Sequence, residues 1–159
     1  MTGGRPAGAV VARVERLLPA SPDAVYRAWT DPATMARWMS PFGRAEVTAD
    51  VRPGGGLRVA MVEGDVRIEH TGEFRELDPP RRLSFTWRSP YTGTEPSVVT
   101  VELIDRGGST HLILTHERLP DEVVASHEGG WRSMVERLAA LLAGPSGVAG
   151  QPGQEEANR

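Results

Sequence analysis

Three histidines are the residues of this chain best placed to do chemistry. His70 and His116 each fall on the apolar side of an alternating, strand-like segment, at the end of an inward-facing apolar series. His127 lies in a helical segment one turn before Trp131, so both side chains can face the same neighbour. An imidazole in a cavity can orient a ligand carbonyl or phenol, or transfer a proton near neutral pH. His70 and His116 are therefore candidate catalytic residues, and all three histidines are candidate ligand contacts.

Each histidine also has a purely structural interpretation. A buried neutral ring can bond a backbone carbonyl and a hydroxyl, which avoids the cost of about 1–3 kcal/mol for an unpaired buried polar group. His127 can equally lie on the flank of its helix, exposed to water. The sequence leaves both interpretations open.

The other candidate ligand contacts are apolar residues on the inward side of their strands or of the last helix. An aromatic strip at strand spacing is more often core packing than a shelf for a ligand, although one residue can serve both purposes. These candidates are Phe74, Phe85, Trp87, Val101, Leu114, Trp131 and Val135. Arg16 shares the alternation of Val14 and Leu18, so it is expected to point inward, paired with an acid such as Glu117 or facing a ligand carboxylate.

Residue spacing argues against a metal site and against nucleophilic catalysis. His116-Glu117 and His127-Glu128 each begin like the zinc-peptidase motif, but neither has a second histidine four residues after the first. The chain has no cysteine, and no serine lies on a Gly-x-Ser-x-Gly turn. We therefore expect no metal and no cofactor.

The elements that must position these residues follow from hydrophobic periodicity. The pattern predicts one strand from Val10 to Leu18, two short helices that begin at Ser21-Pro22 and Asp31-Pro32, and six further strands up to His116. A long amphipathic helix then runs from about Pro120 to Leu142 and ends near Gly144-Pro145. Consecutive strands joined by short turns pair antiparallel, and the last helix is the long element available to cover their apolar face.

Two adjacent glycines, Gly129 and Gly130, interrupt that last helix. Each disfavours the helix by roughly 1 kcal/mol relative to alanine. A close backbone approach to the sheet, or a bend around a cavity, would account for their presence.

Composition is that of an ordinary globular protein. With 159 residues, we expect one domain over residues 10–144, a disordered leader at 1–9 and a disordered tail at 145–159. The net charge of -3 gives no sign of a nucleic-acid partner, and no stretch approaches the length of a membrane span. The expected location is the cytoplasm.

Several local strings resemble the START-like, or Bet v 1-like, helix-grip (SRPBCC) superfamily, and above all its branch similar to the C-terminal domain of the activator of the heat-shock-protein-ninety ATPase. The strings together cover about residues 10–144 and are Tyr26-Arg27-Ala28-Trp29-Thr30-Asp31-Pro32, Arg37-Trp38-Met39-Ser40-Pro41, Arg52-Pro53-Gly54-Gly55, Asp78-Pro79-Pro80-Arg81-Arg82-Leu83 and Gly130-Trp131. The resemblance implies an α+β fold in which a seven-stranded antiparallel sheet wraps around the C-terminal helix and encloses an apolar cavity. It carries over no catalytic residue, because no single catalytic motif unites that superfamily.

The function favoured by these observations is binding of a hydrophobic small molecule, aromatic, polyketide or lipid-like, between the sheet and the last helix. One alternative is an enzyme of the polyketide cyclase, aromatase or dehydratase kind that uses a pocket histidine. Another is a co-chaperone or a regulator's partner, which would bind a protein or a second copy of this chain through an exposed apolar patch. Whether the protein is an enzyme stays open at this point.

Overall fold

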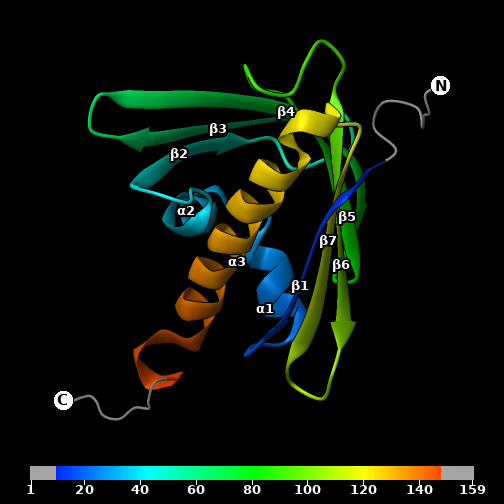
Figure 1. Ribbon diagram of the computed structural model, residues 1–159. Coiled ribbons are helices and arrows are strands. Elements are labelled where there is room, and N and C mark those ends of the chain that lie inside the picture. The colour runs from blue at the N-terminus through cyan, green and yellow to red at the C-terminus, as the bar shows by residue number, and fades with distance from the viewer. Residues whose placement is uncertain (1–9, 148–159) are drawn as a thin grey trace.

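The computed structural model describes residues 10–147, and within them the seven strands form one antiparallel sheet (Figure 1). The order across the sheet is β1-β7-β6-β5-β4-β3-β2, so every neighbour except β1–β7 is also a neighbour in sequence. The strands are β1 Ala12–Leu18, β2 Arg44–Ala49, β3 Gly56–Glu63, β4 Val66–Asp78, β5 Arg82–Trp87, β6 Ser97–Asp105 and β7 Thr110–Glu117. This arrangement confirms the predicted helix-grip architecture and its element order.

Two short helices follow the first strand and begin as the sequence predicted. In α1, Pro22–Ala28, the Ser21 hydroxyl accepts a hydrogen bond from the backbone N–H of Ala24. In α2, Pro32–Trp38, the Asp31 carboxylate accepts one from Thr34. Each helix has proline in its first turn, where no intrahelical donor is needed.

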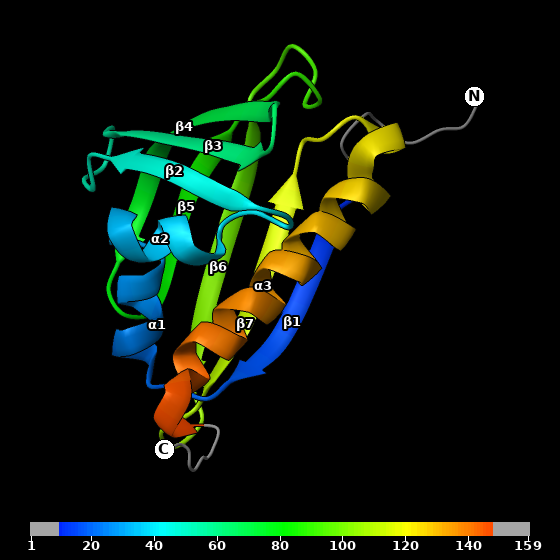
Figure 2. The ribbon, with the colours of Figure 1, turned by 90° about the vertical axis from the view of Figure 1, so that its left-hand side faces the viewer.

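The sheet bends along β4, where the pairing of this strand with β5 is irregular. A register shift between Phe74 and Glu76 interrupts its pairing with β5, and the bulge bends the strand. At Gly72 a β-carbon would lie 1.9 Å from the carbonyl oxygen of Thr86, so only glycine permits this approach. As a result β2, β3 and the start of β4 reach over the face that β5, β6, β7 and β1 present (Figure 2).

The long helix α3, Val124–Gly147, crosses that concave face (Figures 1 and 2). A 3₁₀ turn, η1 Asp121–Val123, precedes it, so the expected helix start near Pro120 becomes a tighter first turn. At Gly144 the backbone leaves helical geometry with a φ of 62°, which agrees with the predicted end. Arg16 of β1 faces this helix and binds the Glu136 carboxylate through two nitrogens, at 2.7 and 3.1 Å, where the sequence had suggested Glu117.

One explanation offered for the paired glycines is wrong. A β-carbon added at Gly129 or Gly130 would meet no atom within 4 Å, so the helix makes no close backbone approach there. Gly129 faces solvent, whereas Gly130 is half-buried and borders a cavity. The second explanation, a bend around a cavity, is met only in part: Gly130 borders the cavity, but within the described residues the non-helical backbone of α3 is at Gly144 and not at the paired glycines.

The predicted leader at residues 1–9 lies outside the described residues, as does the predicted tail apart from residues 145–147, which continue after the Gly144 break. Among the helices that are described, none has the length and apolar character needed to cross a membrane.

Candidate ligand-binding cavity

A cavity of about 380 Å³ lies between the first half of α3 and the strands β3, β4 and β5. Loops 40–43 and 88–96 also contribute to its wall. Its lining is mainly apolar and aromatic, and within the described residues no charged side chain borders it. The lining residues are Pro41, Phe42, Met61, Ile68, His70, Trp87, Tyr91, Val123, Ser126, His127, Gly130, Trp131 and Met134.

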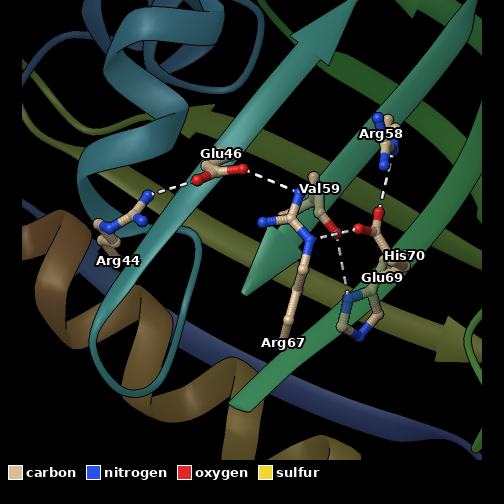
Figure 3. A network of polar contacts seen from close by, with 7 residues as sticks. All are labelled: Arg44, Glu46, Arg58, Val59, Arg67, Glu69 and His70. Carbon is tan, nitrogen blue, oxygen red and sulfur yellow. Dashed lines mark hydrogen bonds and ion pairs between the residues drawn. The ribbon is translucent and has the colours of Figure 1, made fainter. Parts of the chain in front are cut away.

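His70 lies on the cavity side of β4 and is only 6% exposed. Its Nδ1–H donates to the Val59 carbonyl oxygen of β3 at 3.3 Å, and the second ring nitrogen points away from Val59 (Figure 3). The ring stacks on Trp87 with a centroid distance of 4.7 Å. Burial lowers the pKa of His70 to about 4, against the opposing effect of the nearby carbonyls of Val59 and Ile68. At neutral pH the ring is therefore uncharged.

His127 enters the cavity from the opposite wall, on the first turns of α3. Its Nδ1–H donates to the Val123 carbonyl oxygen one turn earlier, at 2.8 Å. The side chain is half-buried, and its ring meets that of His116 edge to face at 5.3 Å. Two imidazoles, one from the sheet and one from the helix, thus border the same space.

His116 has a different role because both of its ring nitrogens are already bonded inside the protein. The Trp131 indole N–H donates to Nδ1 at 3.0 Å, so the proton of the neutral ring is on Nε2 and is donated to the Ser97 hydroxyl at 2.8 Å. Ser97 in turn donates to the Trp87 carbonyl oxygen. Burial first, then the neighbouring histidines, lower the pKa of His116 to about 3. This series of hydrogen bonds orients the Trp131 indole and joins it to the backbone of Trp87.

The structure separates the sequence-predicted contacts into two groups. His70, Trp87, His127 and Trp131 line the cavity, and their contact with a ligand stays a prediction. The other group is packed in the core, away from the cavity lining, with His116 directly behind Trp131. That group is Phe74, Phe85, Val101, Leu114, His116 and Val135, each at most 1% exposed.

Several lining residues were not predicted from the sequence. Met61, Ile68 and Met134 carry a usable signal, since each continues an inward-facing apolar series. Gly130 also carries a usable signal, because it is a glycine on the inner side of an amphipathic helix, where a larger side chain would be expected. Loop residues carry none, because periodicity does not extend to them. Those are Pro41, Phe42 and Tyr91.

One wall of the cavity is held by Arg137 of α3. Its guanidinium donates to the carbonyl oxygens of Ser40 and, at 3.1 Å, Gly43, the two ends of the loop that carries Phe42. Gly43 has a φ of 57°, and a β-carbon there would overlap the Val62 carbonyl. The α2–β2 loop is therefore fixed to both the helix and the neighbouring strand.

The charged residues of this part of the sheet lie on its other face. Arg67 bridges Glu46 and Glu69 at 2.9 and 2.7 Å, and Arg44 and Arg58 extend the row (Figure 3). Because side chains alternate along β4, Arg67 and Glu69 point away from the face that carries His70. No group of three or more potential metal-binding side chains occurs in the described part of the chain.

A curved antiparallel sheet that grips a long helix over a cavity defines the helix-grip class of proteins. Within that class, residues 19–143 match the family of "Activator of Hsp90 ATPase homolog 1-like protein", and the chain belongs to this family. It is 26% identical over 113 residues to mouse activator of 90 kDa heat shock protein ATPase homolog 1, a match that covers 70% of this chain and 30% of that protein. The chain thus spans less than a third of that curated relative.

Solved structures support the same assignment. A Chromobacterium violaceum protein, CV1439, superposes with a TM-score of 0.75 at 29% identity, over 83% of this chain and 96% of that one. The AHSA1 protein of Silicibacter pomeroyi superposes with a TM-score of 0.70 at 30% identity, over 84% and 98% of the two chains.

Proposed function

We propose that this protein binds a hydrophobic small molecule, of aromatic, polyketide or lipid-like type, in the cavity beneath α3. The observation that carries the proposal is the cavity of about 380 Å³ itself, with its apolar and aromatic wall. Its volume lies in the range of about 300–1,000 Å³ that is typical of small-molecule sites. A cytoplasmic location is part of this proposal.

The wall combines a large apolar area with a few polar atoms in fixed positions. Trp87 and Trp131 lie 5.3 Å apart at an angle of 50°, and together they form an aromatic corner. Met61 and Met134 are unbranched and adapt to different shapes of guest. His70 and His127 provide the polar end. Such a site selects for a guest with an apolar body and a small polar group.

Gly130 offers a direct way to fill the cavity without disturbing its wall. A leucine at 130 would extend from the helix into the cavity, and nothing within 4 Å obstructs its β-carbon. Gly129→Leu is the matched control, because that position is equally open but faces solvent. Both changes replace glycine with a good helix former, so both should raise helix stability by roughly 1 kcal/mol.

The experiment is a thermal-shift screen of the wild type with medium-chain fatty acids and two- and three-ring aromatic compounds. A guest present at 100 times its Kd stabilises the folded state by about 2.7 kcal/mol, which raises Tm by several degrees. Compounds that stabilise the wild type should stabilise Gly129→Leu equally and Gly130→Leu much less. Stabilisation of both variants alike, or of the wild type by no compound, would contradict the proposal.

A second candidate is a role as a protein-binding domain. It is favoured by the family, which is named for activators of the Hsp90 ATPase, and by the mouse relative, itself an activator of that ATPase. Binding of purified Hsp90 to the chain, measured by calorimetry, tests this candidate. The Gly130→Leu variant should bind such a partner unchanged, because its new side chain is directed into the cavity.

A further inference from the structure

The two cavity histidines are both held through the same ring nitrogen. Nδ1 of His70 bonds the Val59 carbonyl oxygen, and Nδ1 of His127 bonds the Val123 carbonyl oxygen. A carbonyl oxygen can only accept, so each Nδ1 must carry its hydrogen. In the neutral ring the remaining nitrogen, Nε2, then has a lone pair and no hydrogen. Each ring therefore offers a guest a hydrogen-bond acceptor.

A third polar group of the wall has the same property. The Ser126 hydroxyl donates to the carbonyl oxygen of Val123 at 3.0 Å, so its hydrogen is engaged and its lone pairs remain. The indole N–H of Trp131, which would be a donor, is occupied by His116. Near His127 the wall is thus rich in acceptors.

We propose that the natural guest is an aromatic alcohol, a phenol or a hydroxylated polycycle, whose O–H donates to Nε2 of His70 or of His127. This inference rests on the binding function proposed above. The aromatic body would lie against Trp87 and Trp131. An ether or a ketone of the same shape would leave the imidazole nitrogens without a donor. A carboxylate would enter a cavity with no arginine or lysine among its described lining residues, at a high desolvation cost.

A series of naphthalene derivatives tests this assignment on one constant ring system. 2-Naphthol has the donor, 2-methoxynaphthalene has only an acceptor, 2-naphthoate is an anion, and naphthalene has no polar group. We expect calorimetric titration at pH 7 to show 2-naphthol binding about tenfold more tightly than 2-methoxynaphthalene, since one hydrogen bond and one unpaired acceptor separate them. 2-Naphthoate should be the weakest ligand of the four.

Two variants assign the effect to the histidines. His70→Phe and His127→Phe keep an aromatic ring and remove the acceptor, so one or both should reduce the preference for 2-naphthol severalfold while naphthalene binding is retained. His111→Gln is the control, because His111 bonds Glu15 at 2.9 Å on the opposite face of β7. That variant should keep the full preference.

The outcomes separate the inference from the function on which it rests. Naphthalene binding with no preference for 2-naphthol over its methyl ether, or a preference for 2-naphthoate, would overturn the inference and leave the binding function standing. An unchanged preference in both phenylalanine variants would also overturn it. Failure of all four compounds to bind would overturn the binding function itself, and the inference with it.

Discussion

The two halves of the interface between α3 and the sheet differ in how completely they are filled. In the half toward the helix C-terminus, Trp29 and Trp38 pack edge to face at 4.6 Å, and Trp29 lies 6.3 Å from Phe85. All three side chains are completely buried, as is Leu138 of α3. We call this the filled half. In the other half, the hollow half, Gly130 has no side chain, and the space beside it remains open and is bordered by Met61 and Met134.

Polar groups are treated differently in the two halves. In the filled half, the Trp29 indole N–H and the Tyr26 hydroxyl are buried without a hydrogen-bond partner among the described residues. In the hollow half, His70, His116 and His127 are each held by hydrogen bonds in defined orientations. The filled half therefore leaves two buried polar groups unpaired, a cost in stability that its close packing must offset, although the Trp38 indole N–H does donate to the Ala28 carbonyl oxygen at 3.1 Å. The hollow half fixes polar atoms around a space, as a binding site does.

The largest effect is expected from emptying the filled half. Trp29→Ala should lower the free energy of unfolding by about 3–5 kcal/mol, because it removes a fully buried ring from among three other rings. Met134→Ala should cost less, since its side chain already borders open space. Urea denaturation at neutral pH compares the two variants. A larger loss for Met134→Ala would mean that the cavity wall, and not the tryptophan cluster, dominates stability.

The buried histidines of the hollow half predict a loss of stability in mild acid. The pKa values of His70 and His116 are lowered to about 4 and about 3, so between pH 6.5 and 5 the unfolded chain binds protons that the folded chain does not. Stability should be constant above about pH 6.5 and fall below it, by about 1.4 kcal/mol per pH unit for each fully neutral histidine.

His70→Phe sharpens this prediction, because it should remove one histidine's share of that pH dependence. Urea denaturation at several pH values between 5 and 7 measures the slope for both proteins. Identical slopes in the wild type and the variant would show that His70 is protonated as readily in the folded state as in the unfolded chain.

A smaller effect is expected where the two halves meet. Arg137→Ala releases the loop that carries Phe42 and should cost about 1 kcal/mol of stability, since two partly exposed hydrogen bonds are lost. It should also weaken guest binding a fewfold, because that loop forms one wall. Arg132→Ala is the control, as its exposed side chain pairs with Glu128 of the same helix, at 3.4 Å. Equal behaviour of the two variants in denaturation and titration would exclude a role for the loop in the site.

The sequence was sufficient to predict the helices and strands, and periodicity explains why, whereas the wrapping of the sheet around the last helix was implied by the family resemblance. Strand alternation, two Ser/Asp–Pro helix starts and the amphipathic last helix are local signals, and each appears in the structure at or near its expected position. The inward orientation of His70 and His116 followed from the same alternation, and both are buried.

The division between cavity and core could not be predicted in the same way. Phe85 and Trp87 are two residues apart on one face of β5, yet only Trp87 borders the cavity. The difference arises from what each ring meets across the interface: Trp29 faces Phe85, whereas the opening at Gly130 lies near Trp87 and Trp131. Such pairings depend on the curvature of the sheet and the position of the helix, which no single segment encodes. His116 shows the same limit, because its bonds to Trp131 and Ser97 join three separate elements.

The contrast between the two halves can be measured directly by fluorine NMR with 5-fluorotryptophan. The chain has four tryptophans, two in the cavity wall and two in the filled half, and each gives one signal. On titration with a guest that stabilises the protein, the signals of Trp87 and Trp131 should shift strongly, while those of Trp29 and Trp38 should move little. Shifts confined to Trp29 and Trp38, or no shift at any of the four at saturating guest, would contradict a binding site beneath the first half of α3.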